Sequence, residues 1–178
     1  MGTAEKIKLI AFDVDGTLTP GTLAIGPDGE EWKLFHVKDG LAISLAHRMG
    51  YRTGLITGRA SQAVLHRSRE LHMDFVLMSA KDKVAAMKGK LEEYGLSWDE
   101  IAYMGDDLND LPLLKRSAFG GTPADGAAEV RASADFIAKA GGGRGAAREF
   151  IEVIMKAQSR WDEALSSFSQ VQPEELRQ

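Results

Sequence analysis

An alternation of short apolar runs with stretches of helical hydrophobic spacing constrains the fold of this chain most. Apolar runs that resemble buried strands occupy residues 8–12, 51–56, 75–78 and 101–104, and helical patterns separate them at 39–49, 61–71 and 83–94. Parallel strands need crossover connections, and these are usually helices. We therefore predict an α/β fold, a Rossmann-like three-layer sandwich with a mostly parallel sheet.

Weaker patterns continue the alternation in the second half of the chain. Strands are predicted at 118–120 and 135–138, and helices around Leu113, over 124–132 and from the glycines at 141–145 to about Ala157. Beyond Ser159 the composition turns polar, and we predict a short helix and then a loose tail from Gln170. This gives a core of residues 1–158 and a C-terminal segment of residues 159–178.

One segment departs from the alternation directly after the first strand. Short β-like runs at 22–25 and 31–35 flank the turn sequence Gly26-Pro27-Asp28-Gly29, which is typical of a hairpin. We predict a small β-hairpin insertion at about residues 20–36. An α/β fold often places an active-site lid or an interface arm at this point.

Composition narrows the classes of partner. The 178 residues contain 22 Lys and Arg against 26 Asp and Glu, a formal charge of −4, so no overall basic field would hold nucleic acid or an anionic membrane. The absence of cysteine excludes disulfides, thiolate catalysis and cysteine metal sites. No apolar run approaches the roughly 20 residues needed to span a bilayer, and residues 1–6 lack the core of a signal peptide. We expect a cytoplasmic protein without nucleic-acid or membrane partners.

Two carboxylates follow the first strand at once, in the sequence Asp13-Val14-Asp15-Gly16-Thr17. Residues two apart in an extended chain face the same way, so Asp13 and Asp15 share a small volume. Their repulsion is relieved by a divalent cation between them or by a proton on one of them. Phosphoryl transfer uses both solutions: one carboxylate attacks phosphorus, and the other protonates the leaving oxygen and then activates water.

A second acidic group, formed by Asp106, Asp107 and Asp110, follows the strand at 101–104. The carboxyl ends of parallel strands meet at one edge of the sheet, where such folds bind ligands. The two groups together make an all-oxygen site that suits Mg²⁺. A single acidic pair would more often be a solvated turn or a helix cap, but the combination favours a site.

Two further residues fit phosphate chemistry. Thr57 ends the second strand and can donate its hydroxyl to a phosphoryl oxygen, and Lys83 can neutralise the phosphoryl charge. Without the acidic motifs, Thr57 would be read as an ordinary strand residue and Lys83 as a solvated charge at the start of a helix.

The order of these motifs resembles the four-motif pattern of the haloacid dehalogenase-like phosphatases, and the resemblance extends through Lys156. It implies Asp13 as nucleophile and Asp15 as general acid and base. It also implies Mg²⁺ held by Asp13, the Asp15 carbonyl and Asp106, with Asp107 and Asp110 supporting the metal ligands and Thr57 and Lys83 on the phosphoryl group.

Finer features are similar to the 3-deoxy-D-manno-octulosonate 8-phosphate phosphatases, a branch without a large cap domain. These features are the sequences at 12–16, 35–40, 57–59 and 142–149, the hairpin and Arg67. The resemblance implies a 2-keto-3-deoxy sugar acid phosphate of eight or nine carbons as substrate, a role in lipopolysaccharide biosynthesis, and a homotetramer in which hairpins assemble and neighbouring chains close the site. The chain departs from the branch at Thr17, Pro20 and Ser79-Ala80, where Val, Asp and Gln-Gly are usual, and this bears on the sugar rather than on catalysis.

The carboxylate of such a substrate needs a cation besides those on the phosphate. Arg59, next to Gly58, and Arg67 are the predicted substrate-binding residues for it. Arg144 lies near a helix N-terminus, where it either meets an anion or points to water, and His36 lies beside the hairpin within possible reach of a substrate.

Two alternatives belong to other classes. The first is a non-catalytic phosphosugar-binding or oligomerisation module, similar to the domain attached to acylneuraminate cytidylyltransferases. The second is a two-component receiver, which also clusters Asp, Thr and Lys, but whose acceptor Asp ends a later strand, whereas this Asp-x-Asp-Gly-Thr follows the first.

Overall fold

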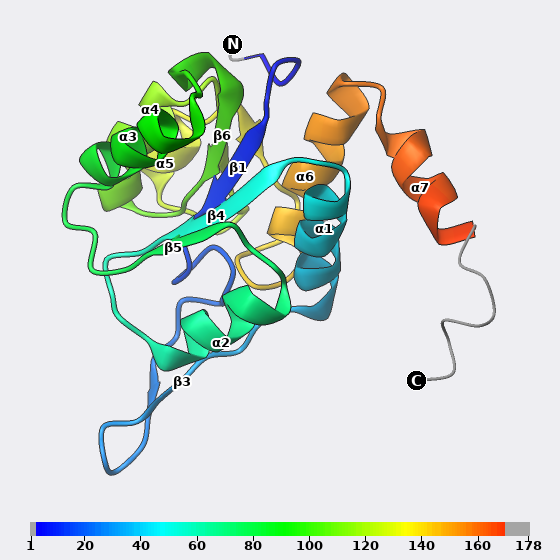
Figure 1. The fold of residues 1–178 in the computed structure, drawn as a ribbon. Helices are drawn as coiled ribbons and strands as arrows, with labels where there is room; N and C mark the ends of the chain where they lie inside the picture. Colours follow the sequence, from blue (N-terminus) through cyan, green and yellow to red (C-terminus); the bar gives the residue numbers. More distant parts are fainter. Residues whose placement is uncertain (1–2, 170–178) are drawn as a thin grey trace.

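A six-stranded parallel sheet forms the centre of the protein (Figure 1). The structure, a computed structural model, describes residues 3–169, so the tail predicted from Gln170 lies outside the described residues. The strand order is β5-β4-β1-β6-β7-β8, and all five neighbouring pairs are parallel. The strands are β1 (Leu9–Phe12), β4 (Arg52–Ile56), β5 (Phe75–Leu77), β6 (Ile101–Met104), β7 (Phe119–Thr122) and β8 (Phe136–Ile137). The predicted fold class is confirmed.

Helices cover both faces of this sheet (Figure 1). One layer holds α1 (Val37–Arg48), α2 (Gln62–Glu70) and α6 (Ala146–Ala157), with α7 (Trp161–Ser169) beside α6. The other holds α3 (Lys83–Tyr94), α4 (Leu111–Arg116) and α5 (Ala128–Arg131), with the 3₁₀ turns η1 (Trp98–Glu100) and η2 (Leu108–Asp110). The helix predicted at 124–132 is shorter, because the N–H of Ala127 donates to the carbonyl of Asp106 at 2.7 Å and holds the preceding residues in a turn.

Alternate residues of the central strand face two separate cores. Ile10 and Phe12 of β1 pack in the core beneath α1, α2 and α6, whereas Leu9 and Ala11 pack in the core beneath α3, α4 and α5. A strand covered on both faces must be apolar throughout, which explains the uninterrupted apolar run before Asp13.

The predicted hairpin is present but shorter than expected. Its strands β2 (Ala24–Ile25) and β3 (Glu31–Trp32) pair antiparallel, with Ala24 opposite Trp32 and Ile25 opposite Glu31. The hairpin lies between β1 and α1 in the chain and projects away from the sheet (Figure 1). Large apolar side chains on and near it are exposed.

The strand order also explains where a ligand would bind. The chain builds β4 and β5 on one side of β1 and then crosses to β6, β7 and β8 on the other. Connections leave the carboxyl ends of the central strands in opposite directions at such a switch point and open a crevice there. Among the described residues, no helix is long and apolar enough to cross a membrane.

Candidate active site

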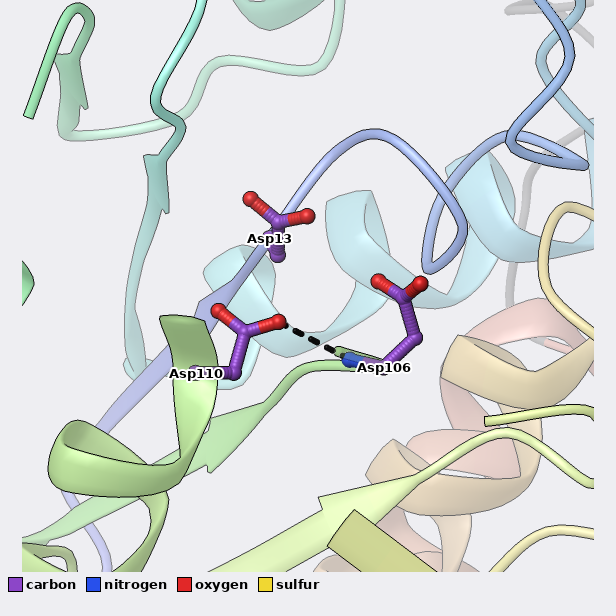
Figure 2. Close-up of side chains that lie close together, drawn as sticks. All are labelled: Asp13, Asp106 and Asp110. Atoms are coloured by element: carbon purple, nitrogen blue, oxygen red, sulfur yellow. Dashed lines mark hydrogen bonds between the residues drawn. The ribbon is translucent and has the colours of Figure 1, made fainter. Parts of the chain in front are cut away.

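The two acidic segments meet at the carboxyl end of β1. The N–H of Asp13 donates to the carbonyl of Met104 at 2.9 Å, which extends the pairing of β1 with β6 by one residue. Asp106 follows β6 two residues later. Asp13, Asp106 and Asp110 each place a carboxylate oxygen within 4.8 Å of the others, and Figure 2 shows the three side chains gathered in one place.

Asp110 is the structural member of this cluster. It is fully buried, and its Oδ1 accepts hydrogen bonds from Lys83 at 2.5 Å and from the hydroxyl of Tyr103 at 2.6 Å. Its Oδ2 accepts from the backbone N–H groups of Asp106 at 3.0 Å and Asp107 at 3.2 Å; the first bond is the dashed line in Figure 2. Four donors occupy this carboxylate, so it fixes the loop that carries Asp106.

Negative charge exceeds positive charge at the centre of the cluster. The Nζ of Lys83 lies 2.7 Å from Asp13 Oδ1 and is the cation that contacts these carboxylates among the described residues. Burial, followed by repulsion from Asp110, raises the pKa of Asp13 to about 6. Burial, followed by repulsion from Asp13, raises the pKa of Asp106 to about 7. Both carboxyl groups are therefore short of positive charge.

A hard divalent cation fits this donor set. With Asp110 occupied by its own donors, the carboxylates of Asp13 and Asp106 remain for a metal, and Thr17 orients the second by donating to its Oδ1 at 3.0 Å. Their oxygen atoms and uncompensated charge match the preference of Mg²⁺.

We expect the stability of the metal-free protein to fall with rising pH. Asp13 and Asp106 bind protons more tightly in the folded chain than in the unfolded one, so the free energy of unfolding decreases as the pH rises from the ordinary pKa of 3.8 through about 7. Mg²⁺ at 100 times its dissociation constant adds about 2.7 kcal/mol to the free energy of unfolding. This corresponds to an increase of roughly 5–10 °C in melting temperature. Thermal unfolding at pH 5 and pH 7.5 should show the larger Mg²⁺ effect at pH 7.5. An equal effect of Mg²⁺ at the two pH values would contradict a metal site at these carboxylates. Asp106→Asn should remove most of the stabilisation by Mg²⁺.

Gly16 allows the close approach of Asp106 to the loop after β1. Its φ is +92°, and a Cβ there would lie 1.9 Å from Asp106 Oδ2. The backbone of this loop curls back on itself, since the N–H groups of Leu18 and Thr19 both donate to the carbonyl of Val14 at 3.0 Å. A side chain at this position would therefore displace Asp106.

We expect Gly16→Ala to lower the kcat/KM of a reaction at this cluster by roughly 100-fold, a loss that a displacement of about 1 Å can cause. Gly50→Ala is the matched control, because Gly50 has a φ of +82° and no atom of the described part of the chain lies within 4 Å of a Cβ there. Positive φ costs both variants about 1–2 kcal/mol of stability. Steady-state kinetics should separate them, and equal activity in the two variants would disprove the clash.

Asp13 and Asp106 of the cluster line a cleft of about 310 Å³. The lining residues are Asp13, Asp15, Gly21, Leu23, Thr57, Gly58, Arg59, Asp106, Asp107 and Asn109. Thr57 is held in place by its N–H, which donates to the carbonyl of Leu77 at 2.9 Å, and its Oγ1 accepts from the N–H of Arg59 at 3.3 Å. Among residues 3–169 the hydroxyl proton of Thr57 has no acceptor, so this proton can be donated to a ligand in the cleft. Asp107 is exposed and accepts from the N–H of Leu108 at 2.8 Å.

Three predicted residues lie away from this cleft. Arg67 pairs with Glu70 at 2.8 Å, and its guanidinium lies 6.0 Å from the ring of Phe35. His36 precedes the first residue of α1 without a side-chain capping hydrogen bond, and its Nδ1 lies 3.9 Å from Asp39. Arg144 is exposed and lines a separate surface hollow with Pro20, Leu34, Phe35, His36 and Gly143.

Three other polar residues at the site were not predicted from the sequence. Tyr103 is fully buried and donates to Asp110. Lys33 of the hairpin contacts Asp15 in the loop after β1, and Glu31 contacts Lys33 and Arg59. A signal existed for Tyr103, because a tyrosine hydroxyl inside an apolar strand needs a partner. For Lys33, the alternation of Glu31, Trp32 and Lys33 indicates that one face of the hairpin strand is charged. It does not indicate which residues that face contacts.

Comparisons with known proteins agree with this geometry. The family model described as haloacid dehalogenase-like hydrolase matches residues 75–149. The 3-deoxy-D-manno-octulosonate 8-phosphate phosphatase KdsC of Escherichia coli (strain B / BL21-DE3) is 35% identical over 164 residues, which cover 92% of this chain and 87% of that protein.

Solved structures give the same result. The corresponding phosphatase from Moraxella catarrhalis, in complex with a magnesium ion, a phosphate ion and a KDO molecule, superimposes with a TM-score of 0.90 at 38% identity and covers 93% of this chain and 95% of its own. The cobalt-bound enzyme from Haemophilus influenzae gives a TM-score of 0.85 at 32% identity over 89% of this chain and 92% of its own.

Fold, acidic cluster and family model together place the chain among the haloacid dehalogenase-like hydrolases. Sequence identity over most of both chains identifies the family within this class: the chain belongs to the 3-deoxy-D-manno-octulosonate 8-phosphate phosphatase family.

Proposed function

We propose that the protein is a Mg²⁺-dependent phosphomonoesterase that hydrolyses 3-deoxy-D-manno-octulosonate 8-phosphate or a nine-carbon analogue. The observation that carries this proposal is the carboxylate pair of buried Asp13 and half-buried Asp106, which is short of positive charge and lines a cleft, in a chain of this family. Residues 1–158 would form the catalytic core. We place the reaction in the cytoplasm, as the sequence predicts.

In the first half of the reaction, Asp13 is the nucleophile. Lys83 holds its Oδ1, so Oδ2 attacks phosphorus, the bond from phosphorus to the sugar oxygen breaks, and an aspartyl phosphate forms. Asp15 gives its proton to the departing sugar oxygen. Thr57 donates to a phosphoryl oxygen, and Lys83 offsets the charge that develops near Asp13.

In the second half, Asp15 reverses its role. Its carboxylate takes a proton from water, the water oxygen attacks phosphorus, and inorganic phosphate leaves Asp13. Mg²⁺, held by the carboxylates of Asp13 and Asp106 and the carbonyl of Asp15, would neutralise charge between nucleophile and phosphoryl group. Asp107 and Asp110 would support this metal set, the second through the hydrogen bonds that fix the Asp106 loop.

For the sugar, Arg59 and Gly58 at the cleft are the proposed contacts of the substrate carboxylate. Arg67 lies off the cleft of its own chain, so any role on a substrate would require another arrangement or a neighbouring chain.

A homotetramer assembled through the hairpin is the proposed quaternary state. Six of the ten exposed large apolar side chains of the described residues lie between residues 23 and 41, and two of them, Trp32 and Leu34, are 63% and 75% exposed. Such a concentration is typical of an interaction surface. Light scattering at micromolar concentration tests it, and a fully active monomer would refute it.

Phosphate release from a panel of sugar phosphates tests the function. With Mg²⁺, we expect the highest kcat/KM on eight- or nine-carbon 2-keto-3-deoxy acid phosphates and a much lower value on glucose 6-phosphate, which lacks the carboxylate. Equal turnover of all esters would contradict the proposed substrate, but it would still support phosphatase activity. No turnover of any ester by a tetramer would favour the non-catalytic module.

A further inference from the structure

One cationic side chain of the hairpin is turned inward. The side chain of Lys33 is 3% exposed, although its neighbours Trp32 and Leu34 are largely exposed. Its Nζ lies 2.5 Å from Asp15 Oδ1 and 2.5 Å from Glu31 Oε1. Burying an ammonium group is costly unless it is paired and hydrogen-bonded, so these two carboxylates are what keep Lys33 in this position.

Glu31 is itself held by Arg59, in the loop after β4. Its Oε2 accepts a hydrogen bond from Arg59 Nη2 at 2.5 Å, and its side chain is 15% exposed. The chain of contacts from Arg59 through Glu31 and Lys33 to Asp15 therefore ties the hairpin to the loops after β4 and β1.

Asp15 has little else to fix its side chain. Among the described residues, Lys33 is the only hydrogen-bond donor to this carboxylate. Within residues 3–169 its Oδ2 has no hydrogen-bond partner, and Arg59 Nε lies 3.9 Å from it. Asp15 stands three residues beyond β1, so its backbone is outside the sheet.

We propose that Lys33, supported by Glu31, is a positioning residue for Asp15, which makes the hairpin part of the active site of its own chain. The inference rests on the proposed function of Asp15. Lys33 holds Oδ1 and leaves Oδ2 to exchange a proton with the sugar oxygen. Proton transfer requires heavy atoms about 2.6–3.2 Å apart, and a carboxylate free to turn would spend little time at that distance.

Lys33→Met tests this proposal, because the substitution removes the charge and keeps the length of the side chain. Its effect is compared for two substrates with different leaving groups. The comparison is kcat/KM for 3-deoxy-D-manno-octulosonate 8-phosphate against 4-nitrophenyl phosphate, since this constant reports steps up to aspartyl phosphate formation. A sugar alkoxide needs the proton of Asp15, whereas 4-nitrophenolate leaves without one. We expect a loss of roughly 100-fold for the sugar phosphate and of less than about 5-fold for the aryl ester. Equal losses, or no loss, would overturn the proposal.

Two further variants keep the test decisive. Lys33→Met leaves Arg59 as the cation near both Glu31 and Asp15. The double variant Glu31→Gln, Lys33→Met removes one negative charge together with the lysine charge, and we expect the same leaving-group dependence. Lys8→Gln is the control, because Lys8 pairs with Glu100 at 2.6 Å at the opposite end of the sheet. It should leave both constants unchanged, and every variant should keep the parent mass in light scattering. If the parent does not hydrolyse the octulosonate ester, glucose 6-phosphate replaces it, so failure of the proposed substrate does not decide this test.

Discussion

We expect Asp13→Asn to abolish phosphate release, with kcat falling by at least about 10⁴-fold. An amide oxygen does not form a stable acyl phosphate, and removal of a nucleophile is among the largest single losses known for hydrolases. The amide has nearly the same shape, and it cannot repel Asp106 and Asp110. The metal-free variant should therefore remain folded and unfold at the parent temperature or above it, in contrast to its loss of activity.

Activity and thermal unfolding measured on the same samples check this expectation. Asp99→Asn is the matched control, because Asp99 is exposed in η1, which precedes β6 at the end of the sheet away from the cleft. It should keep full activity. Turnover by the Asp13→Asn protein close to that of the control would mean that another group attacks phosphorus, and an unfolded variant would be uninformative about the nucleophile but would contradict the expected stability.

Lys83→Met should damage both stability and catalysis. Lys83 is 4% exposed and bonds to Asp13, Asp110 and the Tyr103 hydroxyl. Removing one partner of a buried ion pair costs about 3–5 kcal/mol, or roughly 6–20 °C in melting temperature for a chain of this size. We expect kcat/KM to fall by roughly 10²–10³-fold as well, because the charge that develops on the phosphoryl group loses a fixed cation.

The pH dependence of this damage identifies its cause. The pKa of Asp13 is about 6, so at pH 5 this carboxyl is mostly protonated and needs no counterion, whereas at pH 8 it is charged. The drop in melting temperature should be larger at pH 8 than at pH 5 in metal-free buffer. Lys88→Met, on the same helix and in an exposed pair with Glu92, should change stability by about 0–1 kcal/mol at either pH. A drop independent of pH would assign the effect of Lys83 to packing.

The core of the site could be predicted because it depends on local pattern and one rule of sheet geometry. Asp13 and Asp106 follow directly on apolar runs, and parallel strands bring such positions to a common edge. The pairing of β1 with β6 then determines that the two carboxylates meet. No information beyond strand ends and strand order is needed for this part.

The surroundings of the site depend on angles that the sequence does not encode locally. The hairpin pattern predicts two strands and a turn, but tertiary contacts set the direction in which the hairpin leaves β1, and this direction brings Lys33 to Asp15. Likewise, Arg59 and Arg67 look equivalent as substrate cations in the sequence. The loop after β4 turns Arg59 into the cleft, whereas Arg67 lies on a face of α2 that packs near Phe35.

The order of strands also determines when this enzyme acquires its site during synthesis. β1 is the first strand of the sheet to be made, yet its two neighbours are β4 and β6, and Phe12 pairs with Leu55 on one side and with Met104 on the other. A nascent chain that ends before Met104 leaves one edge of a fully apolar strand unpaired, and contacts between such distant residues form slowly. The carboxylates assemble only when β6 docks, so metal can bind no earlier than the centre of the sheet is complete. Until then the unpaired edge of β1 is open to association with other unfinished chains.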